Sequence, residues 1–208
     1  MVQSRPARTL QLSDLRDKFG LTRTDEAAFF PEWETDLPEL SVAEQRRLDE
    51  VRSHYLYLLE YPVLESIVKM VVLSPILELA GFYHPPFRVS GEVGVRVTAY
   101  DNGEVIQGSI DVLVVQQQLW VTVIEAKNSE LSLTKALPQT LAYLLGGAAQ
   151  QRPVFGAILN GTEFIFIKLM GGAEPRYGLS DTFSLLNRDN NLPGVVRILK
   201  RLGQLVAE

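Results

Sequence analysis

The chain has 208 residues, 46% of them hydrophobic, which is enough for one domain with a buried core and an extension. It contains no cysteine and only two histidines, His54 and His84, which excludes disulfides, thiol catalysis, cysteine-ligated zinc and a histidine-rich metal site. The formal net charge of −5 and the pI near 5.2 count against a protein that binds nucleic acid through a basic surface alone.

Residues 1–61 are predicted to form a helical accessory region packed on a core of residues 62–208. A short helix is expected after Ser13 and should end at Gly20, since glycine is common where helices stop. The loop that follows contains an aromatic cluster, interpreted as packing, with base stacking on nucleic acid as the alternative: Phe29, Phe30 and Trp33.

A second helix of this region is predicted to begin at a capping box formed by Ser41 and Glu44, and to extend to about Glu60. In a capping box each side chain bonds to the backbone amide of the other residue. One apolar face at helical spacing should dock on the core, and it consists of Leu48, Val51, Tyr55 and Leu59.

The core is predicted to begin with a helical segment at residues 63–81, which Pro75 kinks or divides because proline lacks an amide hydrogen. Three strands should follow, at residues 92–100, 105–115 and 119–127, since these runs are rich in β-branched and aromatic residues.

Short polar segments separate these strands. Asp101-Asn102-Gly103 favours a tight turn between the first two strands, and Gln116-Gln117-Gln118 links the second strand to the third. The second and third strands are therefore predicted to be an antiparallel hairpin.

A helix is predicted next, at residues 133–145, with its regular part beginning near Leu137 because Pro138 fits only its first turn. Asn160-Gly161 then predicts a tight hairpin between residues 154–159 and 162–168. Together these elements predict an α/β fold, in the form of an α+β mixed sheet flanked by helices.

The charged residues that are candidates for catalysis or metal binding lie in the predicted hairpin. Asp111 interrupts one apolar strand, and Glu125-Ala126-Lys127 closes the next. Because side chains alternate along a strand, Glu125 and Lys127 should point to the same face, with Asp111 across from the Glu125 region. Burying three charges at the end of an apolar ribbon is costly unless they pair with one another or bind a metal.

Asp111 and Glu125 could be the carboxylate ligands of Mg²⁺, which binds oxygen ligands and keeps several waters or substrate phosphates. Mn²⁺ is the expected substitute. Lys127 would hold the attacking water or stabilise charge on the phosphoryl oxygens. The alternative is a structural ion pair between Lys127 and Glu125, with Asp111 capping a turn.

The helix after the hairpin carries Gln139 and Tyr143, which are four residues apart and so share one face. They could face the strand end or a nucleic-acid backbone. The alternative is a surface glutamine beside a partly buried tyrosine.

Asp111, the Glu125-Ala126-Lys127 triplet and the helix with Gln139 and Tyr143 resemble the PD-(D/E)xK nuclease superfamily. The resemblance covers residues 62–168 and is closest to the nuclease module of type I restriction R subunits. Ile110 stands where the motif has proline, a departure seen in many relatives.

The resemblance implies a restriction-endonuclease-like core. It implies that Asp111 and Glu125 bind the metal, that the carbonyl of Ala126 also coordinates it, and that Lys127 assists the nucleophilic water. Gln139 and Tyr143 are further catalytic candidates.

The family pattern also implies a glutamate on the helix before the sheet. Glu65 is the best match, because Glu60 precedes the break at Pro62 and Glu92 stands at the start of a predicted strand. The alternative for Glu65 is a solvated residue that interacts favourably with the helix dipole.

The functional hypothesis is a Mg²⁺-dependent nuclease acting on nucleic acid, expected to be DNA. A non-catalytic nucleic-acid-binding or assembly module that keeps the fold is the alternative. One core carries one site, so cutting both strands of a duplex would favour a homodimer. With no signal peptide and no membrane-spanning stretch, a cytoplasmic location without membrane contact is expected.

The late part of the chain includes a predicted basic amphipathic helix at residues 195–202, interpreted as a solvated face with nucleic-acid contact as the alternative. The late basic residues could gather on one side of the molecule, and they are Arg152, Arg176, Arg188, Arg197, Lys200 and Arg201.

Overall fold

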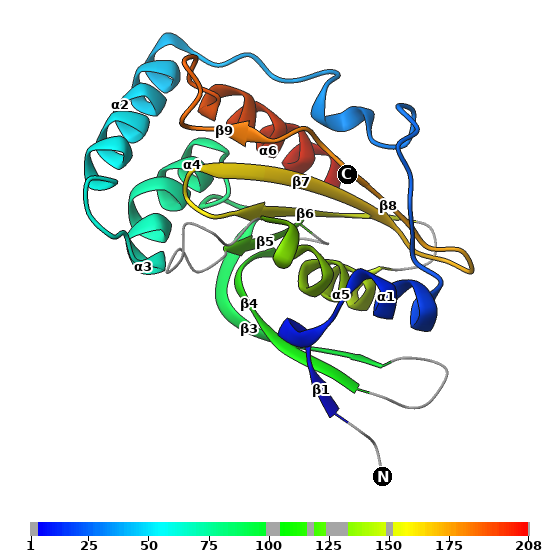
Figure 1. The fold of residues 1–208 in the computed structure, drawn as a ribbon. Coiled ribbons are helices and arrows are strands. Elements are labelled where there is room, and N and C mark those ends of the chain that lie inside the picture. The colour runs from blue at the N-terminus through cyan, green and yellow to red at the C-terminus, as the bar shows by residue number, and fades with distance from the viewer. Residues whose placement is uncertain (1–3, 99–104, 116–118, 124–132, 149–151, 208) are drawn as a thin grey trace.

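The computed structural model describes residues 4–98, 105–115, 119–123, 133–148 and 152–207. These residues form a mixed α/β fold in which one sheet lies between two layers of helices (Figure 1). The predicted arrangement of a mixed sheet flanked by helices is therefore confirmed. None of the helices in the described ranges is long and apolar enough to cross a membrane.

The described strands belong to one sheet. In chain order they are β1 (Ser4–Pro6), β2 (Thr22–Arg23), β3 (Arg88–Thr98), β4 (Val105–Val115), β5 (Leu119–Val123), β6 (Pro153–Leu159), β7 (Glu163–Met170), β8 (Arg176–Leu179) and β9 (Phe183–Ser184). The order across the sheet is β1-β4-β5-β6-β7-β8-β2, with β3 paired to β4 and β9 to β7. The sheet is mixed because β3, β4 and β5 form an antiparallel meander whereas β5 and β6 are parallel.

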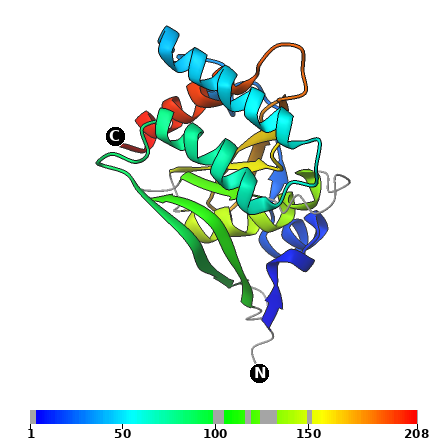
Figure 2. The ribbon, with the colours of Figure 1, turned by 90° about the vertical axis from the view of Figure 1, so that its left-hand side faces the viewer.

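Helices cover both faces of this sheet. They are α1 (Leu12–Phe19), α2 (Val42–Leu58), α3 (Glu65–Val68), η3 (Lys69–Leu73), α4 (Ser74–Leu79), α5 (Leu137–Gly147) and α6 (Leu192–Ala207), with short turns η1 (Ala7–Thr9), η2 (Pro31–Trp33) and η4 (Leu133–Lys135). In Figure 1, α2, α4 and α6 lie above the sheet, and α5 and α1 lie below it. Figure 2 shows α2 beside the α3–α4 segment, in front of the strands.

Strand β6 shows why two cores form. Phe155 and Leu159 are buried with the layer of α2, α4 and α6, whereas Val154 and Ile158 are buried with the layer of α1 and α5. Alternate side chains point to opposite faces, so an apolar strand covered on both sides contributes to both cores.

The predicted three-strand meander is present, with one boundary corrected. Strand β4 has the predicted bounds, but β3 begins at Arg88, so the prediction that Glu92 opens the strand was wrong. β3 extends back to Arg88 because it pairs with β4 as far as Val115. The partner strand therefore sets the length of β3, which its own sequence pattern did not predict. The turn predicted at residues 101–103 and the last residues of the third strand lie outside the described ranges.

The tight turn predicted at Asn160-Gly161 is confirmed. The Asn160 Oδ1 atom accepts hydrogen bonds from the amides of Thr162, at 3.2 Å, and Glu163, at 2.9 Å. Gly161 has φ of +94°, a conformation that glycine adopts without strain. The turn joins β6 to β7 in antiparallel register from Pro153–Met170 to Leu159–Phe164.

The helical segment predicted at residues 63–81 forms from Glu65 to Leu79 without a break, and its regular α-helical pattern is interrupted just before Pro75. A π-helical turn, η3, separates α3 from α4, and the Ser74 amide bonds to the Lys69 carbonyl five residues back. Pro75 then falls in the first turn of α4, where a missing amide hydrogen costs no intrahelical bond. The wide turn lets the chain continue as a helix around the proline.

The first helix begins earlier than predicted. Helix α1 starts at Leu12, and Gln11 forms its capping box with Asp14, so Ser13 lies inside the first turn rather than before it. The amide of Gln11 donates to Asp14 Oδ2 at 2.8 Å, a bond that fixes the earlier start. The helix ends at Gly20 as predicted, with a φ of +67°.

The N-terminal region does more than cover the core, because it adds two strands to the sheet. β1 pairs in parallel with β4, and β2 pairs in parallel with β8. The aromatic cluster of this region is packed as interpreted: Phe29 and Phe30 are buried, and the Trp33 ring meets that of Phe183 edge-on at 6.2 Å.

Helix α2 docks through the predicted face. Leu48, Val51 and Tyr55 are almost fully buried, and Leu59 packs on the same cluster. Ser41 and Glu44 form the predicted capping box at its start. The apolar stripe therefore joins α2 to the core.

We expect Val51→Asp to lower the free energy of unfolding by several kcal/mol, because it buries a carboxylate without a partner. Val42, on the same helix but 75% exposed, provides the matched control, and Val42→Asp should change little. Urea denaturation of both variants measures the difference. Equal midpoints for Val51→Asp and the wild type would show that α2 is a detached arm.

Glu44 also links α2 to α6. It accepts an ion-paired hydrogen bond from Lys200 Nζ, together with bonds from the amide and hydroxyl of Ser41 at 2.7 and 2.8 Å. The hydrogen bond from Lys200, followed by those from Ser41, lowers the pKa of the Glu44 carboxyl from 4.5 to about 2. The folded state therefore favours the charged form of this side chain.

A lowered pKa in the folded state stabilises the protein above the unfolded pKa, and the stabilisation is lost as pH falls from about 4.5 toward 2. We expect Glu44→Gln, which keeps a capping amide but no charge, to cost at most about 3 kcal/mol at pH 7. The difference from the wild type should shrink below pH 4, as measured by urea denaturation across pH. Glu39→Gln, at a side chain 90% exposed, is the control; a pH-independent deficit in Glu44→Gln would contradict the assignment.

Candidate functional site

Asp111 lies within β4, between Ile110, which pairs with Val93 of β3, and Val112, which pairs with Val121 of β5. The predicted antiparallel pairing of the Asp111 strand with the next strand is confirmed. By this register Asp111 comes level with Thr122, close to the last described residue of β5.

The triplet Glu125, Ala126 and Lys127 lies outside the described residues, as does the side chain of Asp111. Their convergence on one metal ion stays a prediction. Among the described residues there is no group of three histidine, cysteine, aspartate or glutamate side chains placed to hold a metal. The side chains of the predicted ligands, Asp111 and Glu125, are not among those that the structure describes.

The carboxyl end of β5 lies beside the carboxyl end of β6. The two strands are parallel, with Val123 paired to Leu159, and β6 then enters the turn at Gly161. Tyr55 of α2 and Val68 of α3 cover this turn: a Cβ on Gly161 would lie 2.1 Å from the Tyr55 hydroxyl and 3.1 Å from Val68 Cγ2. Helix α3 therefore lies at the end of the sheet from which the chain continues to Glu125.

This position distinguishes the three glutamates proposed for the helical role. Glu65 begins α3, three residues before Val68, and its half-buried carboxylate forms an ion pair with Lys69 one turn later. Glu60 lies after the end of α2 and is exposed. Glu92 lies inside β3, and its side chain is outside the described set. Among these three, Glu65 is the one carried by the helix at this end of the sheet.

Gln139 and Tyr143 share one face of α5, as predicted, and the Gln139 Nε2 atom donates to the Tyr143 hydroxyl at 2.7 Å. Tyr143 is 1% exposed, so it faces the sheet rather than an external nucleic-acid backbone. Helix α5 begins at Leu137 with Pro138 in its first turn, also as predicted.

Tyr143 rests directly on strand β4. A Cβ on Gly108 would lie 2.0 Å from the Tyr143 hydroxyl oxygen and 2.9 Å from Cζ, so only glycine lets the ring approach this closely. Gly108 lies three residues before Asp111 on the same strand. The tyrosine therefore positions β4 relative to α5, and an isolated glycine inside a strand was the sequence feature that could have revealed it.

The basic residues of α6 do not form a free cationic face. Arg197 and Arg201 form ion pairs with Glu39, at 3.3 Å, and Asp36, at 3.5 Å. Lys200 is held by Glu44 as described above. The interpretation of this helix as a solvated basic face was wrong for these side chains, because an acidic loop packs against them.

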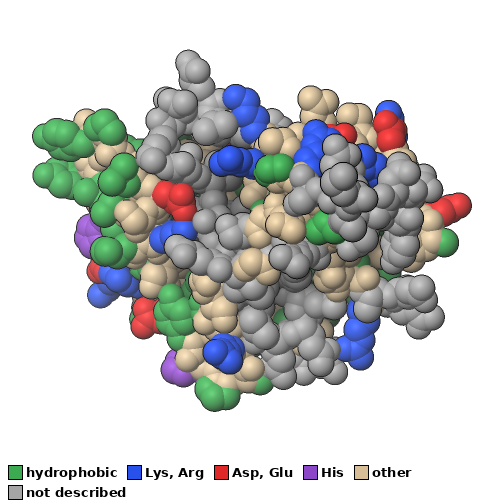
Figure 3. All heavy atoms as spheres, turned by 90° about the horizontal axis from the view of Figure 1, so that it is seen from below, with side chains coloured by type: hydrophobic (Ala, Val, Ile, Leu, Met, Phe, Trp, Pro, Cys, Tyr) green, Lys and Arg blue, Asp and Glu red, His purple; other side chains and the backbone are tan. Residues whose placement is uncertain are grey.

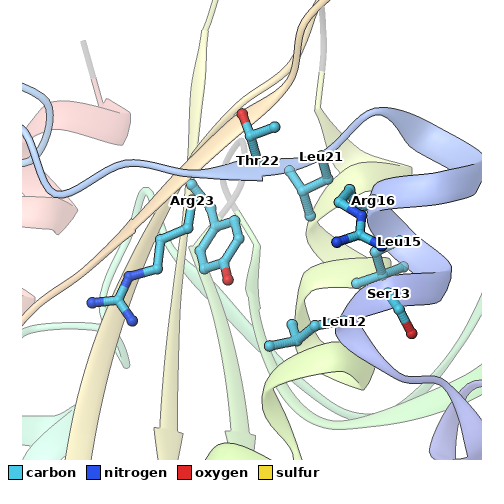
Figure 4. A pocket seen from close by; sticks show the side chains of 8 residues that line it. Leu12, Ser13, Leu15, Arg16, Leu21, Thr22 and Arg23 are labelled. Carbon is cyan, nitrogen blue, oxygen red and sulfur yellow. The ribbon is translucent and has the colours of Figure 1, made fainter.

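A cavity of about 250 Å³ lies at the opposite end of the sheet, between α1, β2 and β8 (Figure 4). Its floor is apolar, formed by Leu15, Leu21 and Tyr177. Arg16 and Arg23 stand on its rim, but each pairs with a neighbouring aspartate, and Arg23 extends away from the cavity. The lining residues include no carboxylate, so this cavity does not offer a metal site.

In comparisons with known proteins, no family model matches this chain and no curated protein matches it. The functional assignment therefore depends on the motif, the strand order and the position of the described side chains.

The contact between Tyr143 and Gly108 can be tested as a pair. We expect Gly108→Ala to cost about 1–3 kcal/mol of unfolding free energy, because the new methyl group overlaps a buried ring. Tyr143→Phe in the Gly108→Ala background should recover part of this loss, although alone it removes the Gln139 hydrogen bond. A double-mutant cycle by urea denaturation measures the coupling.

Gly94→Ala in β3 is the matched control, since nothing lies within 4 Å of a Cβ built there. It should leave stability nearly unchanged. If the Gly94 and Gly108 variants lose equal stability, close approach of Tyr143 is not the reason for glycine at position 108.

Proposed function

We propose that the chain is a Mg²⁺-dependent nuclease with a restriction-endonuclease-like core. The observation that carries the proposal is the set of partners of β5. This strand, which leads to Glu125, pairs antiparallel with the strand of Asp111 and parallel with β6. Helix α5, which bears Gln139 and Tyr143, makes the connection between the two parallel strands.

The order of elements supports the same proposal. A helical segment ending in α4 precedes the antiparallel meander β3-β4-β5, and α5 and the β6–β7 hairpin follow it. The resemblance implies that the aspartate and the glutamate bind the metal. Asp111 is on the second strand of the meander, β4, and Glu125 comes two residues after the last described residue of the third, β5.

Asp111 and Glu125 would hold the ion through carboxylate oxygens, with the Ala126 carbonyl as a third ligand, a donor set suited to a hard divalent cation. When bound, Mg²⁺ supplies positive charge that polarises the scissile phosphate and acidifies a water. Lys127 would orient the attacking water by hydrogen bonding and stabilise negative charge on the phosphoryl oxygens. The leaving 3′ or 5′ oxygen would take up a proton from water.

Glu65 and Tyr143 have supporting roles in this proposal. The Glu65 carboxylate, at the end of the sheet where β6 terminates, would hold a water or an outer ligand of the site, with Lys69 as its counter-ion. Tyr143 acts as a positioning residue, because its buried hydroxyl contacts β4 rather than open space. Gln139 in turn fixes the Tyr143 hydroxyl.

The substrate proposed is nucleic acid, with DNA expected from the resemblance. The net charge of −5 and the pairing of the α6 cations leave little long-range attraction for a polyanion. Substrate binding would then rest on the metal ion and local contacts, and weak affinity at physiological salt follows.

The same electrostatic observations favour a second candidate, a non-catalytic nucleic-acid-binding or assembly module that keeps the fold. In that case Lys127 would be a structural counter-ion of Glu125. The two candidates differ in whether the chain binds a divalent ion.

We expect Asp111→Ala to abolish both Mn²⁺ binding and cleavage, because it removes a ligand. Lys127→Ala should keep metal binding and lose activity on the order of 10²-fold or more, since an ammonium is not a ligand but positions water and charge. Calorimetric Mn²⁺ titration beside cleavage of single- and double-stranded DNA measures both quantities.

Asp17→Ala, which removes an exposed carboxylate on α1, is the control and should match the wild type in both assays. If Lys127→Ala cuts at the wild-type rate, the lysine is only a counter-ion. If the wild-type chain binds no Mn²⁺ at millimolar concentration, the nuclease proposal is contradicted and the non-catalytic module is favoured.

A further inference from the structure

One edge of the molecule exposes large apolar side chains that the candidate site does not use. Tyr57, at the end of α2, is 67% exposed, and Met70, in η3, is 66% exposed. Between them in the chain, Tyr61 and Leu64 are 70% and 55% exposed. We call these four residues the apolar edge patch. Hydrophobic side chains gather along the left edge of the molecule in Figure 3, the side on which α2 and α3 lie in Figure 1.

A groove of about 470 Å³ lies beside these side chains. It runs between α2 and η3 and is lined by Ser53, His54, Tyr57, Leu58 and Val71. The same surface thus combines two exposed tyrosines with a groove whose volume of about 470 Å³ exceeds that of one aromatic side chain. Such a surface can be complementary to itself.

The groove lining includes no aspartate, glutamate, lysine or arginine. At the border, the carboxylate of Glu65 is compensated by Lys69. The exposed Glu60, next to Tyr61 in the chain, and His54 in the groove lining are further polar groups of this surface. On a chain of net charge −5, a surface with so few charges is where two copies can meet with little repulsion. A nucleic acid, by contrast, would need more cations than the paired Lys69 provides.

The area is suited to the centre of a dimer interface. From the exposed fractions, the four side chains present on the order of 500 Å², within the roughly 300–600 Å² of the largest apolar patch on typical monomers, which is often functional. A standard interface takes about 800 Å² per partner, with an apolar centre and a polar rim. The patch supplies the centre, and the groove walls and α2 supply the rim.

We propose that the apolar edge patch is a two-fold symmetric interface with a second copy of this chain. Tyr61 of one copy enters the groove between α2 and η3 of the other, and the reverse contact follows by symmetry. Met70 packs on the incoming ring, a favourable contact for its sulfur. This interface does not depend on the proposed nuclease function, but a dimer would bring two of the proposed sites to a duplex.

Sedimentation velocity on the full chain tests the interface. At about 100 μM the wild type should sediment with twice the 23.3 kDa mass of one chain, and dilution should shift it toward monomer. The double variant Tyr61→Glu with Met70→Glu should be monomeric at the same concentration, with at least a tenfold weaker association, because it places like charges in the interface. Circular dichroism verifies that the variant is folded.

Leu186→Glu is the matched control, because Leu186 is 62% exposed but lies between β9 and α6, outside the patch. It should dimerise like the wild type. A wild type that stays monomeric, or a double variant that dimerises as strongly as the wild type, overturns the proposal.

Metal titration on the same samples separates this inference from the proposed function. A monomeric chain that binds Mn²⁺ and nicks one strand contradicts only the dimer. A dimer that binds no Mn²⁺ contradicts only the nuclease. The double variant should still bind the ion, since the patch contains none of the proposed ligands.

Discussion

Strand β4 is the constraint on which the arrangement of the candidate site depends. One edge pairs with β3 along its length, and the other pairs with β1 near Val105 and with β5 near Val112. Its face is fixed by Tyr143, whose ring fills the space that a side chain at Gly108 would occupy. A strand held on both edges and one face has little freedom, so the backbone of Asp111 is pre-organised before any ligand binds.

The N-terminal region completes this framework and also sets the electrostatic character of the surface. Glu32 forms a largely buried ion pair with Lys168 of β7, whose ammonium lies 5.6 Å from the Phe29 ring centroid. Other acids of this region pair with the cations of α6. These contacts neutralise Lys168, Arg197 and Arg201, so the same interactions that stabilise the fold weaken its attraction for the phosphates of nucleic acid.

The proposed site and the proposed interface place different demands on one helical segment. The half-buried Glu65 begins α3 at the end of the sheet where the site is proposed, whereas Met70, in the π-helical turn, is exposed toward the apolar edge patch. The π turn changes which residues face outward along the segment, because it adds a residue to the helical repeat. A single short segment can therefore present a carboxylate to the sheet end and an apolar side chain to a partner.

Patterns local in the chain determined much of this protein. The β-branched composition of residues 105–115 predicted β4, the Asn160-Gly161 dipeptide predicted the turn between β6 and β7, and the Ser41–Glu44 spacing predicted a capping box. Each of these features depends on residues within a few positions of one another. Tertiary structure alone decided the rest: the pairing of β1 with β4, the burial of Tyr143 over Gly108, and the pairing of Arg197 with an acidic loop 158 residues away. These contacts join segments distant in sequence, and their free energy comes from packing and charge neutralisation that no local pattern encodes.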